Sequence, residues 1–124
     1  MADMAVLRQG VRESLPEIED IRDANLQNKV VEALALALSE TEFERIEEMR
    51  PSANYDTPAM LRGTQADHFR GVARMAVALA DGLEAVMGPI GIDREVLVTG
   101  GLCHDVGKTY EFIPATSNDA SGSW

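Results

Sequence analysis

Cysteine, histidine and aromatic residues are scarce in this chain of 124 residues. It holds one cysteine, two histidines, one tryptophan, two tyrosines and three phenylalanines. A single cysteine excludes an internal disulfide framework. Hydrophobic residues still make up 45% of the chain and charged residues 26%, which is the ordinary balance of a folded protein. The composition therefore predicts one small globular unit rather than a disordered or disulfide-rich chain.

Basic residues and long apolar runs are scarce as well. Eleven lysines and arginines stand against twenty-one acidic residues, for a net charge of −10. Because nucleic-acid binding needs a basic surface for phosphates, we do not expect it here. The longest apolar stretch, residues 30–38, is interrupted by Glu32 and is shorter than the roughly 18 residues of a membrane span. The first four residues lack the pattern of a secretory signal. We expect a cytoplasmic protein without membrane association.

The first half of the chain predicts short helices followed by a loop. Pro16 suits the first turn of a short acidic helix, a longer helix is expected over residues 26–39, and a further short piece over residues 43–49. Residues 50–58 contain Pro51, Pro58 and several turn-forming residues, which predicts a loop. We therefore divide the chain into an N-terminal helical extension and loop, residues 1–62, and a second unit, residues 63–124.

A long helix is predicted over residues 64–87. Thr64 can cap its start, with Asp67 at the capping-box position. At 100° per residue, one apolar face includes His68 together with Val72, Met75, Leu79, Leu83 and Val86. This pattern predicts that His68 faces the core, while Arg70 and the other charged residues lie on the opposite face.

A second helix, over residues 94–104, can be capped by Asp93. Gly100 and Gly101 lie inside it, although each glycine costs up to about 1 kcal/mol relative to alanine in a helix. Both share the face of His104, so they would let another helix approach closely there. Gly71 and Gly82 are candidates for the matching positions on the preceding helix. The alternative is that the glycines only relieve crowding.

The sequence His104-Asp105-Val106-Gly107-Lys108 carries the strongest chemical signal. Adjacent histidine and aspartate offer an imidazole nitrogen and a carboxylate oxygen to a divalent metal ion. Gly107 is expected to take the left-handed conformation that ends a helix. Cys103, next to this motif, is interpreted as a buried thiol rather than a nucleophile. Close packing of the two predicted helices would bring His68 to the same ion.

His68 with Val72 and Ala73, followed about 30 residues later by Gly101 to Lys108, resembles the HD domain superfamily of metal-dependent phosphohydrolases. The resemblance covers residues 62–112, and residues 16–49 are similar to helical extensions of some bacterial members. It implies an all-α, HD-domain-like helical bundle. The implied metal ligands are two histidines and two aspartates, of which His68, His104 and Asp105 are the first three.

The fourth ligand implied by the resemblance has no clear counterpart. The acidic candidate downstream is Asp119, in a stretch of small and polar residues that predicts a loop. Relative to the family pattern, the bundle is therefore expected to be incomplete at its C-terminus. Three explanations are open: a cut chain, a genuinely shortened protein, or a site completed by another chain or by solvent.

The function that the resemblance implies is metal-dependent hydrolysis of a phosphate ester or nucleotide. Asp105 would act as a catalytic metal ligand, and Lys108 would meet a substrate phosphate, although its charge could instead complement a helix dipole. The ion could be Mn, Fe, Co, Ni, Zn or Mg. The alternatives are an HD-type di-iron oxygenase, which needs more histidines, and a catalytically inactive module that binds a ligand or partner.

The expected partner is a small phosphorylated substrate. An incomplete helical bundle would also leave apolar faces uncovered, so a homo-oligomer or a domain swap is a further expectation.

Overall fold

A computed structural model describes residues 2–51 and 62–112, and within these ranges every regular element is helical. The all-α fold expected from the sequence is confirmed. The elements in chain order are α1 (Met4–Ser14), η1 (Pro16–Asp20), α2 (Ala24–Ser39), η2 (Ile46–Glu48), α3 (Gln65–Met87), α4 (Arg94–Cys103) and α5 (Lys108–Glu111), where η denotes a 3₁₀ helix. None of the described helices is long and apolar enough to cross a membrane.

The N-terminal half contains one helix that the sequence analysis did not identify. Helix α1 begins after Asp3, whose side chain accepts a hydrogen bond from the Ala5 amide at 3.2 Å, and it buries Leu7 and Val11 one turn apart. The short acidic helix at Pro16 and the helix ending at Ser39 are confirmed as η1 and α2. Over residues 43–49, only Ile46–Glu48 is helical.

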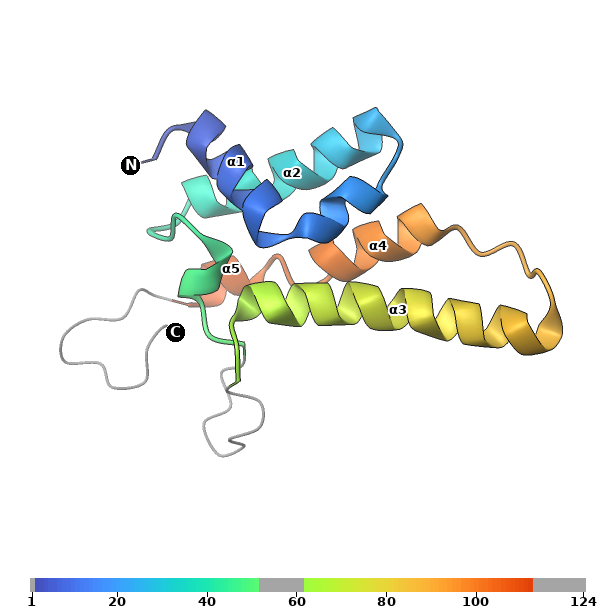
Figure 1. The fold of residues 1–124 in the computed structure, drawn as a ribbon. Coiled ribbons are helices and arrows are strands. Elements are labelled where there is room, and N and C mark those ends of the chain that lie inside the picture. The colour runs from blue at the N-terminus through green and yellow to red at the C-terminus, as the bar shows by residue number, and fades with distance from the viewer. Residues whose placement is uncertain (1, 52–61, 113–124) are drawn as a thin grey trace.

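A single buried cluster unites both halves of the chain. Figure 1 shows α1 and α2 on one side of α4, with α3 on the other side. The cluster takes Val11, Ile18 and Leu34 from the first half and Phe69 and Leu102 from the second half. Each of these side chains is at most 2% exposed. The division at residue 62 stays a prediction, but the core is shared across it.

Helices α3 and α4 pack at very short range through one glycine. The Thr64 capping box at the start of α3 is present, with Asp67 as its partner. A Cβ atom on Gly101 would lie 2.5 Å from the Cα atom of Ala73, so only glycine allows this approach. Cβ atoms added at Gly71, Gly82 and Gly100 would have no neighbour within 4 Å. The expected close contact is therefore confirmed for Gly101, whereas the expectation for the other three glycines is wrong.

The apolar face of α3 that was expected to lie in the core is largely exposed. Met75 is 66% exposed, Leu79 67%, Leu83 50% and Val86 86%. The buried apolar residues of α3 lie about a quarter turn away and are small side chains and one phenylalanine, namely Ala66, Phe69, Ala73 and Ala80; the polar Gln65 at the start of α3 is buried as well. This is the side on which α4 and η2 pack.

Two carboxylates, one buried and one half-buried, attach the first half of the chain to the second. Glu17 of η1 is 5% exposed and accepts a hydrogen bond from Nε of Arg70 at 3.0 Å. Glu95 of α4 accepts hydrogen bonds from the backbone amides of Arg22 and Asp23, the latter at 2.9 Å. These contacts fix η1 and the start of α2 against the α3–α4 pair.

Candidate metal centre

Three side chains converge where the first turn of α3 meets the end of α4. His68 lies in α3, His104 directly follows the last residue of α4, and Asp105 is in the turn after it. One ligand atom from each lies within 4.8 Å of the others. Oδ2 of Asp105 lies 2.9 Å from Nε2 of His68 and 3.2 Å from Nε2 of His104. The three predicted ligands therefore form one group, brought together by the close packing at Gly101.

The orientation of His104 is fixed by the backbone. Its Nδ1 atom donates a hydrogen bond to the carbonyl oxygen of Gly101 at 2.7 Å. Since a carbonyl can only accept, Nδ1 carries the proton, and in the neutral ring the lone pair belongs to Nε2. That nitrogen faces Asp105. A backbone partner on the second ring nitrogen is the usual support of a metal-binding histidine.

Asp105 is held in its charged form. Burial alone would raise the pKa of this carboxyl group, but the hydrogen bond with His68 and the charges of His104, His68 and Lys108 outweigh it, so the pKa is lowered. About one third of each of the three side chains is exposed. The group is therefore accessible from solvent and offers an ionised carboxylate beside two imidazoles, which are donors that suit a divalent transition metal.

The backbone after His104 turns without a left-handed residue. Gly107 has φ −61° and ψ −20°, so the expected left-handed conformation is wrong. Hydrogen bonds from the Val106 amide to the Cys103 carbonyl, at 3.2 Å, and from the Lys108 amide to the Asp105 carbonyl, at 2.9 Å, carry the right-handed turn into α5. Gly107 precedes α5 as its N-terminal flanking residue, and α4 does not need a reversal of the chain at this point.

Lys108 begins α5 and pairs with Glu111. Its ammonium nitrogen lies 2.7 Å from Oε2 of Glu111, and this hydrogen bond raises the pKa of Lys108. Thr109 and Phe112 are buried, and the Tyr110 hydroxyl donates to Glu40 at 2.7 Å. Helix α5 is thus attached to the rest of the protein. Lys108, three residues after Asp105 in the sequence, is its first residue.

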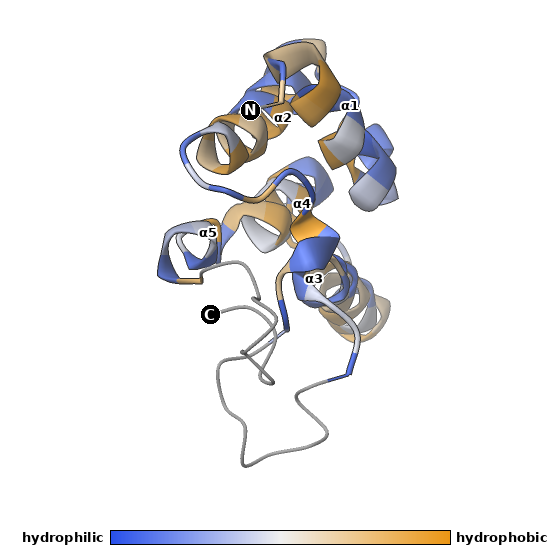
Figure 2. Cartoon of the chain, turned by 90° about the vertical axis from the view of Figure 1, so that its left-hand side faces the viewer, coloured by the Kyte–Doolittle hydropathy of each residue, from blue (hydrophilic) through white to orange (hydrophobic). Residues whose placement is uncertain are grey.

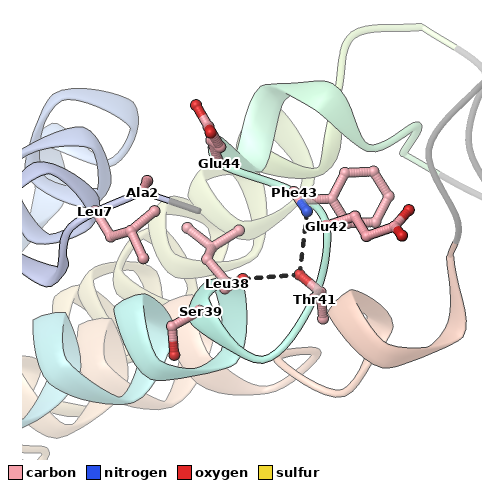
Figure 3. A pocket seen from close by; sticks show the side chains of 8 residues that line it. All are labelled: Ala2, Leu7, Leu38, Ser39, Thr41, Glu42, Phe43 and Glu44. Atoms are coloured by element: carbon pink, nitrogen blue, oxygen red, sulfur yellow. Dashed lines mark hydrogen bonds between the residues drawn. The ribbon is translucent and has the colours of Figure 1, made fainter.

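The pocket shown in Figure 3 lies elsewhere and is a weaker candidate for chemistry. It has a volume of about 290 Å³ and lies between the start of the chain, the end of α2 and the segment that follows α2. The Thr41 hydroxyl donates to the Leu38 carbonyl at 3.0 Å and accepts from the Phe43 amide at 3.3 Å. The hydrogen-bonding capacity of the Thr41 hydroxyl is therefore used within the fold. The remaining polar side chains of the lining are Ser39, Glu42 and Glu44.

Cys103 and Asp119 complete the sequence-based candidates. Burial raises the pKa of the Cys103 thiol, which disfavours the thiolate that a nucleophile needs. Asp119 lies outside the described residues. Two contributors were missed: the Gly101 carbonyl, which orients His104, and Glu111, which pairs with Lys108. Only the spacing of Lys108 and Glu111, three residues apart, was visible as a signal in the sequence.

Comparisons with known proteins agree with the geometry. The family model for the HD domain matches residues 66–119. A curated protein of Methanocaldococcus jannaschii, dihydroneopterin 2′,3′-cyclic phosphate phosphodiesterase, is 31% identical over 101 residues, a match that covers 77% of this chain and 39% of that protein. This chain thus spans well under half the length of that relative. No solved structure matches. The match to the HD-domain family model therefore covers the region that carries His68, His104 and Asp105.

Proposed function

We propose that this chain carries the metal-binding part of a phosphohydrolase of the HD superfamily, with His68, His104 and Asp105 as ligands of one divalent ion. The observation that supports this most is the tautomer of His104, whose Nδ1 proton is held by the Gly101 carbonyl while Nε2 faces the carboxylate of Asp105. A histidine that only packs in the core, with its hydrogen bonds made by the backbone, would not need a second histidine and an ionised carboxylate within 4.8 Å.

The proposed substrate class is a small phosphate ester, including cyclic phosphodiesters. The name of the Methanocaldococcus relative, a 2′,3′-cyclic phosphate phosphodiesterase, supports this class. When bound, a divalent ion polarises a phosphoryl oxygen and lowers the pKa of a water molecule. Asp105 would supply a fixed negative charge. Lys108, whose charge helps to lower the pKa of Asp105, would neutralise a substrate phosphate after leaving its pair with Glu111.

The direct test is metal binding. The full chain, stripped with a chelator, would be titrated calorimetrically with Mn²⁺, Zn²⁺ and Fe²⁺, and its metal content measured after dialysis. We expect one ion per chain. His68→Ala, His104→Ala and Asp105→Ala should each abolish retention of the ion, while Asp20→Ala, which removes an exposed carboxylate of η1, should bind as the parent does.

Activity is tested separately, with bis(4-nitrophenyl) phosphate and a 2′,3′-cyclic nucleotide as substrates. Turnover that depends on the added ion and is lost in the three ligand variants would support the hydrolase. Iron binding with oxygen uptake and no phosphate release would favour the oxygenase alternative. Unchanged metal content in His104→Ala and Asp105→Ala would show that the assignment of the ligands is wrong.

A further inference from the structure

The exposed apolar residues of α3 form one continuous surface, which we call the α3 stripe: Met75, Leu79, Leu83 and Val86. They are spaced by four, four and three residues. At 100° per residue, each lies within about 40° of the mean direction of the four around the helix axis. Their exposed fractions, from 50% to 86%, are unusual for such side chains. Figure 1 shows that this half of α3 extends beyond the α1–α2 layer, and Figure 2 shows hydrophobic colour reaching the outer edge of α3.

Small residues border the stripe along one edge. Ala78 and Gly82 are exposed, and a Cβ atom on Gly82 would meet nothing within 4 Å. Small residues of this kind allow a second helix to approach closely while its large side chains fill the space above them. The stripe and its edge therefore suit a helix that presents large apolar side chains at matching intervals.

A second copy of α3 meets this requirement in the antiparallel direction. If the two-fold axis passes between residues 80 and 81, Met75 faces Val86 of the second copy and Leu79 faces Gly82. Large side chains then lie opposite small ones, and the two ends of the stripe cover each other. In a parallel arrangement each leucine would face its own counterpart, without this complementarity. An isologous contact of this kind is the commonest form of oligomer symmetry.

Charge does not oppose the association, although the chain carries a net charge of −10. The charged residues in this part of α3 lie more than about 100° around the helix from the stripe. They also have partners of opposite charge: Asp81 and Glu84 pair with Arg94, and Arg74 lies 3.7 Å from Glu17. The acidic groups are thus directed away from a second copy placed on the stripe.

The area sets the strength of the contact. Burial of one such apolar side chain removes roughly 60–120 Å² from water, so the six side chains of the stripe and the neighbouring Met87 and Ile90 offer roughly 350–700 Å² per copy. A standard stable interface uses about 800 Å² per partner. The contact should therefore be weak and dependent on concentration.

We propose that the chain self-associates through the α3 stripe as an antiparallel, two-fold dimer. Sedimentation velocity of the full chain from about 10 μM to about 1 mM should show a shift from monomer to dimer. The double variant Leu79→Glu, Leu83→Glu should remain monomeric over this range. Val6→Glu is the matched control, because Val6 is an apolar residue of α1 with 62% exposure; it should dimerise as the parent does. Far-UV circular dichroism checks that each variant is folded.

Cross-linking tests the direction of the helices. In a Cys103→Ala background, chains with Met75→Cys are mixed with chains carrying Val86→Cys and oxidised. The antiparallel pairing predicts disulfides between the two kinds of chain only, because positions 75 are about 16 Å apart in the proposed dimer, too far for a disulfide. Disulfides between like chains would overturn the arrangement. A monomeric parent at about 1 mM, or a glutamate variant that still dimerises, would overturn the proposal itself and leave the stripe to a different helix.

Discussion

Alanine at position 101 should destabilise the protein, whereas alanine at position 100 should stabilise it. The Cβ atom of Gly101→Ala would lie 2.5 Å from Cα, 2.7 Å from N and 2.9 Å from Cβ of Ala73. These are backbone and backbone-proximal atoms that cannot rotate away. Ordinary contact begins at 3.4 Å, so α3 and α4 would have to separate by about 1 Å.

The magnitude follows from a comparison of the two neighbouring glycines. Overpacking of this kind costs about 1–3 kcal/mol, while replacing a helical glycine by alanine gains up to about 1 kcal/mol. At Gly100 the added methyl group meets nothing within 4 Å, so only the gain applies. The free energies of unfolding of Gly100→Ala and Gly101→Ala should therefore differ by about 1–3 kcal/mol, since the helix-propensity term is common to both.

Urea unfolding followed by far-UV circular dichroism measures this difference directly. With a slope of about 1–3 kcal/mol per molar urea, the two midpoints should be separated by roughly 1 M. The separation of α3 from α4 should also weaken metal binding, because His68 is on one helix and His104 follows the other. Equal midpoints for the two variants would refute the close packing at Ala73 and with it the proposed assembly of the site.

Two further perturbations test the attachment of the N-terminal half and of α5. Glu95→Ala leaves the amides of Arg22 and Asp23 without their carboxylate acceptor and should cost about 1.5–3 kcal/mol in urea unfolding; Glu95→Gln, which keeps an acceptor oxygen, should cost less, and equal costs would contradict this role. The hydrogen bond to Glu40 raises the pKa of Tyr110 above 10.0, so its stabilisation is complete below pH 10 and is lost as the pH rises through the folded-state pKa. The difference in stability between the parent and Tyr110→Phe should shrink above pH 10, and a constant difference would argue against the bond.

Local signals in the sequence predicted the helices well. The clearest of these signals are the capping side chains. Thr64 with Asp67 marks the observed start of α3, and Asp93 marks the observed start of α4. The same signal at Asp3 was overlooked, although Leu7 and Val11 follow it at helical spacing. The group of His68, His104 and Asp105 could be predicted because each residue belongs to a motif with a recognisable interval.

Tertiary packing could not be predicted in the same way. The spacing of Met75, Leu79 and Leu83 shows correctly that they share a face, but periodicity does not tell whether another element covers that face. Likewise, Gly100 and Gly101 look alike in the sequence, and only the crossing of α3 over α4 distinguishes them. Contacts such as Glu95 with the Arg22 amide join residues 73 positions apart, and no local pattern announces them.

The buried cluster shared by both halves has a thermodynamic consequence for the candidate metal centre. A ligand that binds only the folded chain stabilises every part that unfolds together with its site, in proportion to the logarithm of its concentration over its dissociation constant. Because Val11 of α1 and Phe69 of α3 belong to one cluster, an ion held by His68 and Asp105 would stabilise α1 as well. Amide exchange in α1 should therefore slow when metal is added, although α1 contributes no residue to the group.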